Sequence, residues 1–173
     1  MLVKLIGGVL VISASAYLGF ALSGECSRRL RDLRALQELL RLLENEIGFL
    51  SSMLADAFIN IAEGSKSPAA LFFESAGRKL ESCGGISAAE AWEAAVRDNI
   101  GKTALNREDE EILTAFGKFL GSSDVEGQVR NIRYTLTRLK VQEEKAEAYR
   151  KKNESLYRNL GMLAGAAIVV LLL

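Results

Sequence analysis

The chain has 173 residues, a length that suits one globular domain with short flanking segments. Its 22 basic and 22 acidic residues balance, which argues against a nucleic-acid-binding protein because such proteins carry a basic excess. The sequence has no histidine, the commonest general base and metal ligand, and its two cysteines, Cys26 and Cys83, are too few for a disulfide framework.

The chain begins with an apolar segment, LVKLIGGVLVISASAYLGFAL at 2–22, whose one charged residue is Lys4. As a helix, residues 5–22 would extend about 27 Å, close to the thickness of roughly 30 Å of a bilayer's hydrocarbon core. We therefore predict an N-terminal transmembrane helix within residues 1–24. The alternative is a signal peptide cleaved after ASA at 14–16, which would make the chain a secreted or surface-tethered helical domain. Cleavage there would leave YLGFAL exposed, so we favour the membrane span.

The next segments have the periodicity of amphipathic helices. Apolar residues at spacings of three and four form one seam and predict a first helix over 26–47 and a second over 51–63. Its members are Leu33, Leu36, Leu40, Leu43, Ile47, Leu50 and Leu54. Gly64 and Pro68 separate the second helix from a third over 68–81, in which we expect Leu71, Phe72 and Leu80 to point inward.

Three more helices are predicted by their caps and apolar faces. Ser87 and Glu90 have capping-box spacing at the start of the fourth, and we expect Trp92 to lie in the core. The fifth, REDEEILTAFGKFLG, ends at Gly121, and Asp124 caps the sixth. The expected buried faces are Ile112, Leu113, Phe116 and Leu120 on the fifth helix, and Val129, Ile132, Leu136 and Leu139 on the sixth. Residues 25–158 therefore predict an all-α fold, a six-helix bundle.

The chain finishes with a second apolar segment, LGMLAGAAIVVLLL at 160–173. It would extend about 21 Å as a helix, which is short for a span but tolerable if the bilayer thins locally. We predict a C-terminal transmembrane helix over 159–173; the alternatives are a terminal helix packed on the bundle or one lying in the membrane interface. Basic residues lie on the bundle side of both apolar segments, which predicts a cytoplasmic bundle with both termini outside the cell membrane. They are Arg28, Arg29, Arg31, Arg34, Arg150, Lys151, Lys152 and Arg158.

No stretch of the sequence indicates catalysis. VRDNIGKT at 96–103 ends like a phosphate-binding loop, but Val96 stands where the first glycine is needed and a helix, not a strand, precedes it. Glu108 and Glu111 are spaced to share a helix face, but the acidic residues nearby do not assemble the ligand set of a metal site. Without histidine, no serine or cysteine has its usual activating base. We expect no enzyme activity, no cofactor and no metal.

Protein binding remains, and two charged patches are candidate docking sites for a partner. One is the acidic turn Glu108, Asp109, Glu110 and Glu111; the other is the basic set Arg130, Arg133, Arg138 and Lys140 on the sixth helix. The alternative for each patch is an ordinary solvated helix face.

Four stretches resemble the stage III sporulation protein AB family of endospore-forming bacteria. They are AWEAAV, TALNREDEEILTAFGKFLGSSDVEGQ, IRYTLTRL and LGMLAGAAIVVLLL. The resemblance runs nearly end to end and includes no chemical motif. It implies a component of the channel in the mother-cell membrane that faces the engulfed forespore.

The resemblance also implies partners. The family is similar to the inner-membrane platform of type II secretion, whose cytoplasmic domains are six-helix bundles. The expected role is a membrane platform or adaptor that docks a secretion-type ATPase, stage III sporulation protein AA, beside other stage III sporulation channel proteins. A secretion platform has two such bundles whereas this chain has one, so a homo-oligomer is compatible with the resemblance. No nucleic acid is expected among the partners.

Overall fold

The computed structural model describes residues 27–47, 54–82, 85–121 and 124–172, with side chains described up to Asn153 and at Leu156. All regular structure in these residues is helical, and six α-helices confirm the predicted all-α bundle. The first is the 27–47 helix, which ends in a short π-helical turn. The others are α2 (Leu54–Glu63), α3 (Ala70–Ser82), α4 (Ala88–Asn99), α5 (Arg107–Gly117) and α6 (Val125–Leu172); a 3-10 turn, η2 (Ile100–Lys102), follows α4.

The chain forms two compact units. One unit, Arg28–Glu144, contains the bundle from the 27–47 helix to the first half of α6. The other combines Met1–Ser27 with Lys145–Leu173. The predicted N-terminal span at 1–24 lies outside the described residues. In the part of the chain that is described, no helix is both apolar and long enough to cross a bilayer.

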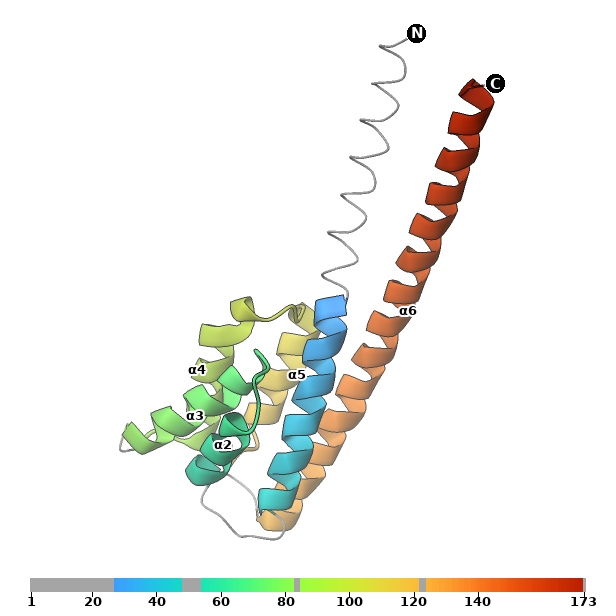
Figure 1. The fold of residues 1–173 in the computed structure, drawn as a ribbon. Coiled ribbons are helices and arrows are strands. Elements are labelled where there is room, and N and C mark those ends of the chain that lie inside the picture. Colours follow the sequence, from blue (N-terminus) through green and yellow to red (C-terminus); the bar gives the residue numbers. More distant parts are fainter. Residues whose placement is uncertain (1–26, 48–53, 83–84, 122–123, 173) are drawn as a thin grey trace. The chain divides into compact units, whose positions relative to one another are not determined.

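An aromatic cluster forms the core among the four helices from α2 to α5, which pack on one another in chain order (Figure 1). The cluster takes a fully buried ring from each of these four helices, Phe58, Phe73, Trp92 and Phe116, and α3 buries a further ring, Phe72. Neighbouring ring centroids lie 5.1 to 5.7 Å apart, and three of the four pairs meet edge to face. The Trp92 indole N–H also donates a 2.8 Å hydrogen bond to the Leu113 carbonyl. The expectation that Trp92 is a core residue is confirmed.

The 27–47 helix contributes the aliphatic part of the core. The predicted seam is buried from Leu33 to Ile47, and Leu30 and Leu39 are buried with it. On α3 the prediction is partly wrong. Phe72 is buried as expected, but Leu71 and Leu80 are half-exposed, and Phe73 and Ala76 take the inward positions. The buried face of α3 is thus rotated from the predicted one toward Phe73 and Ala76.

The ends of the helices largely follow the predicted signals. Ser87 and Glu90 form the expected capping box on α4. α5 ends at Gly117, four residues before the predicted end at Gly121, and Gly121 takes a left-handed φ of +72°, which suits glycine, in the turn that follows. The Asp124 carboxylate accepts a 2.9 Å hydrogen bond from the Gly127 N–H and so caps α6. Gly117 has a packing role instead, since a Cβ there would overlap Cδ1 of the Trp92 ring.

Candidate functional site

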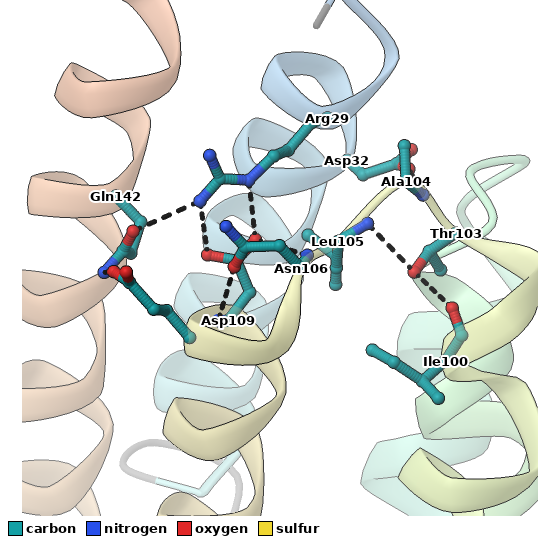
Figure 2. A network of polar contacts seen from close by, with 10 residues as sticks. Arg29, Asp32, Ile100, Thr103, Ala104, Leu105, Asn106, Asp109 and Gln142 are labelled. Atoms are coloured by element: carbon teal, nitrogen blue, oxygen red, sulfur yellow. Dashed lines mark hydrogen bonds and ion pairs between the residues drawn. The ribbon is translucent and has the colours of Figure 1, made fainter. Parts of the chain in front are cut away.

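A polar cluster joins three helices where α5 begins, and we call it the Asp109 network (Figure 2). Asp109 is fully buried although it is charged. Its carboxylate accepts two hydrogen bonds from the Arg29 guanidinium, at 2.8 and 3.0 Å, and a third from the Asn106 N–H at 2.9 Å. The Asn106 side chain in turn accepts from the Asp109 N–H at 3.0 Å, which completes a capping box on α5. The carboxylate is therefore paired and hydrogen-bonded, as a buried charge must be.

The same network extends to α6 through Gln142. Arg29 donates a 3.1 Å hydrogen bond to the Gln142 side-chain oxygen, and the Gln142 amide donates a 2.9 Å bond to the Glu108 carboxylate. One arginine on the 27–47 helix thus contacts both α5 and α6. The 27–47 helix is far from α5 and α6 in the sequence, so these contacts hold the three helices side by side and in a defined register.

The segment before α5 is held by side chains of its own. The Asp32 carboxylate accepts a 2.8 Å hydrogen bond from the Ala104 N–H, and the Thr103 hydroxyl donates to the Ile100 carbonyl at 2.8 Å (Figure 2). Lys102 donates to the Asn99 side chain at 2.8 Å. Lys102 and Thr103 therefore make local structural contacts, and the helical setting of VRDNIGKT agrees with its interpretation as a connecting segment rather than a phosphate-binding loop.

A second buried carboxylate, Glu143 on α6, is surrounded by three donors. Arg34 donates at 2.7 Å, Lys140 at 2.9 Å and Gln37 at 3.1 Å. The hydrogen bond from Arg34, with those from Lys140 and Gln37, holds the pKa of Glu143 at about 2, below its usual value of 4.5. Glu143 is thus a carboxylate anion at neutral pH and links α6 to the 27–47 helix.

A third contact continues this polar row along the same pair of helices. Arg133 on α6 donates a 2.6 Å bond to Glu44 near the end of the 27–47 helix. Arg29 and Arg34, early in the 27–47 helix, contact Gln142 and Glu143 on α6, whereas Glu44, near the end of that helix, contacts Arg133, which comes earlier on α6. The two helices are therefore antiparallel, and we call these three contacts the polar seam.

The acidic candidate docking residues do not form one exposed patch. Asp109 is buried in its network, which corrects the expectation that it lies on a docking surface. Glu110 is half-buried. Glu108 and Glu111 are exposed, but Glu108 binds Gln142 and Glu111 pairs with Arg107 at 3.3 Å. The turn points inward at Asp109 because successive helix residues are rotated by about 100°.

The basic candidate residues divide into two kinds. Arg133 and Lys140 are exposed but belong to ion pairs, with Glu44 and Glu143 respectively. Arg130 is exposed, and Arg138 is half-buried with its guanidinium carbon 6.0 Å from the centre of the Tyr134 ring. The structure therefore keeps Arg130 and Arg138 as candidates for contact with a partner.

A shallow groove of about 350 Å³ runs along α3. Its charges are satisfied internally: Arg78 pairs with Glu74 at 2.7 Å, and Lys79 pairs with Asp98 at 3.0 Å. The hydrogen bond from Lys79 lowers the pKa of Asp98 below its usual value. No group of three or more potential metal ligands is assembled among the residues that the structure describes. The groove and its surroundings thus provide no built ligand site.

Comparison with known proteins is decisive for the family. The family model for stage III sporulation protein AB matches residues 4–173. A Bacillus subtilis (strain 168) protein of that name is 32% identical over 172 residues, covering 99% of this chain and 100% of the relative. The chain belongs to the stage III sporulation protein AB family. A solved structure of a stage III sporulation protein AB superposes with a TM-score of 0.67 at 31% identity, covering 72% of this chain and 97% of the other.

Two of the sequence stretches that resemble the stage III sporulation protein AB family lie in the core and at a helix cap of this fold. AWEAAV contains Trp92 of the aromatic cluster, and the longest stretch contains Asn106 and Asp109 of the α5 cap. Sequence reasoning missed both buried networks. The spacing of Asn106 and Asp109 matches that of a capping box, so this part had a local signal. The partners Arg29 and Gln142 had none, because they lie 80 and 33 positions away from Asp109 in the chain.

Proposed function

We propose that this chain is a non-enzymatic membrane platform or adaptor of the channel between mother cell and forespore. Its helical bundle docks a cytoplasmic secretion-type ATPase, stage III sporulation protein AA, beside other channel proteins. The observation that carries the proposal is the family match over residues 4–173, which includes both apolar segments. The bundle supports it: the buried carboxylates Asp32, Asp109 and Glu143 accept hydrogen bonds inside the bundle, and side chains remain exposed on α6 for a partner.

The proposal places both apolar segments in the mother-cell membrane and the bundle in the cytoplasm. Two of the basic residues behind this orientation have a second role, since Arg29 and Arg34 form ion pairs inside the bundle. This pairing does not weaken the orientation argument, because the positive-inside bias acts on the chain as it inserts. Arg29 and Arg34 would thus orient the chain during membrane insertion and form ion pairs inside the bundle once it has folded.

Topology is tested by labelling single cysteines with a membrane-impermeant thiol reagent. In a chain with Cys26 and Cys83 replaced, we expect Leu2→Cys and Leu173→Cys to be labelled from outside intact cells. Lys66→Cys, in an exposed turn of the bundle, is expected to react after permeabilisation alone. Labelling of Lys66→Cys in intact cells would contradict a cytoplasmic bundle. Labelling at position 2 without position 173 would place the C-terminal helix inside.

Docking is tested with the full chain in lipid nanodiscs and the purified ATPase stage III sporulation protein AA. We expect a stable complex that elutes as one species in size-exclusion chromatography when the ATPase is supplied with nucleotide. The control is an empty nanodisc of the same lipids, which should not retain the ATPase. A failure of the full chain to bind the ATPase, alone or with the other channel proteins, would refute docking while leaving the topology result intact.

A further inference from the structure

We propose that one exposed face of α6 is the surface on which the bundle receives its protein partner. Four side chains form this face, and we call it the α6 stripe: Arg130, Tyr134, Arg138 and Val141. The inferred partner presents a short acidic segment, with carboxylates on both sides of an apolar side chain. This inference rests on the proposed function, since it specifies where and by what chemistry the bundle docks.

The α6 stripe is a continuous helical row. Its members follow at spacings of four, four and three residues, which brings them onto one face of a helix. The row from Arg130 to Val141 extends about 17 Å, or roughly three helical turns. The opposite face of α6 holds Ile132 and Leu139, which are buried in the bundle. The α6 stripe thus points away from the core that holds α6 in place.

The α6 stripe places two exposed apolar side chains between and beside its arginines. Tyr134 is 63% exposed and Val141 is 49% exposed. Tyrosine and arginine are the residue types enriched at energetically dominant interface positions, and apolar patches rimmed by charge are typical of protein interfaces. The Arg138 guanidinium lies against the Tyr134 ring, a cation–π arrangement that holds both side chains on the surface.

The charges of the α6 stripe are available to a partner. Arg130 and Arg138 form no ion pair with any carboxylate of the described residues, whereas Arg133 and Lys140, on neighbouring positions, are paired with Glu44 and Glu143. An unpaired guanidinium binds a carboxylate through two parallel hydrogen bonds, so the natural complement is acidic. This separates the α6 stripe from the rest of the basic set.

The pattern also indicates the size and kind of the occupant. Exposed Glu126 and Glu144 lie one turn beyond each end, so the basic character is confined to about three turns. A nucleic acid would require a longer basic track, and the whole chain is electrically balanced. Two copies of the chain joined through the same face would bring arginine near arginine. A protein segment with two carboxylates spaced about two turns apart fits best.

The test measures binding of the full chain in nanodiscs to the ATPase stage III sporulation protein AA. The double variant Arg130→Glu/Arg138→Glu reverses both charges at surface positions, and we expect it to weaken binding at least tenfold. Tyr134→Ala should weaken binding by a smaller factor that persists in high salt, since it removes apolar contact rather than charge. The matched control, Arg41→Glu/Lys66→Glu, makes the same change in net charge at exposed positions outside the stripe and should bind like the wild type.

Each outcome decides the proposal. A selective loss in the stripe variants supports it. Equal affinity of wild type and stripe variants would overturn the stripe but not the docking function. No ATPase binding by the wild type would overturn both. If the wild type binds a fluorescent single-stranded nucleic acid through the stripe, or if the stripe variants abolish self-association instead of ATPase binding, the inferred acidic partner is wrong.

Discussion

Replacing Asp109 by alanine is expected to lower the free energy of unfolding by about 3–5 kcal/mol, the usual cost of removing one member of a buried ion pair. The substitution removes both hydrogen bonds from Arg29, whose side chain is only 19% exposed in the intact protein, and leaves its guanidinium without a carboxylate. It also removes the acceptor for the Asn106 N–H at the start of α5. The loss is a large fraction of the total stability of a domain of this size.

Urea unfolding of the full chain in detergent, followed by Trp92 fluorescence, measures this loss. Trp92 is the sole tryptophan and is fully buried, so its emission reports on the bundle. The matched control is Glu111→Ala, two residues further along α5. Its pair with Arg107 is exposed on both sides, at 65% and 90%, so we expect a change within about 0.5 kcal/mol. Equal effects of the two substitutions would show that Asp109 does not anchor α5.

The helices could be predicted from sequence because their signals are local. Leucines at spacings of three and four residues predict one buried helix face without knowledge of which helix packs on it. Caps such as Ser87–Glu90 involve residues within a single turn. On α3 the local signal is ambiguous, because Leu71, Phe72 and Phe73 are three consecutive apolar residues. Packing of α3 against α2 and α4 buries Phe72 and Phe73 and leaves Leu71 half-exposed, and this long-range selection is not visible in the local sequence.

The candidate site was predicted less well because its contacts are long-range. Arg29 meets Asp109 across 80 positions, and Arg34 meets Glu143 across 109. A run of four acidic residues has the composition of a solvated patch, and nothing local distinguishes Asp109 from its neighbours. The buried carboxylate emerges when the 27–47 helix packs beside α5. Similarly, the basic residues of α6 differ in availability only because acidic partners on other turns or helices satisfy some of them.

The polar seam suits a bundle that must keep two helices in register. Apolar surfaces slide past one another with little penalty, since dispersion and burial are non-directional. Hydrogen bonds to charged groups have fixed geometry and are lost when a helix shifts by one residue. The seam places one such contact near each end of the 27–47 helix and one between them. In the proposed platform, a partner bound to α6 would therefore act on both helices together.

Glu143 provides the second large prediction, an acid-dependent loss of stability. Its folded-state pKa of about 2 lies below the ordinary 4.5, so between these values the unfolded chain binds more protons than the folded one. Stability from Glu143 is therefore fully present above about pH 5 and is lost as the pH falls toward 2. Arg34 and Lys140 are 53% and 56% exposed, so solvent screening reduces the contribution, and we expect about 2 kcal/mol at pH 7.

Urea unfolding of the wild type and of Glu143→Gln at several pH values between 7 and 3 measures this contribution. The variant should be less stable at pH 7, and the difference should shrink as the pH falls below about 5, because Glu143 of the unfolded wild type then binds a proton while the folded carboxylate stays charged. Glu144→Gln is the matched control, since Glu144 is the next residue along α6 and is exposed. A constant difference across the pH range would mean that the substitution acts through packing rather than through the loss of charge. A difference that shrinks for Glu143→Gln alone would assign the acid sensitivity to the contact between α6 and the 27–47 helix.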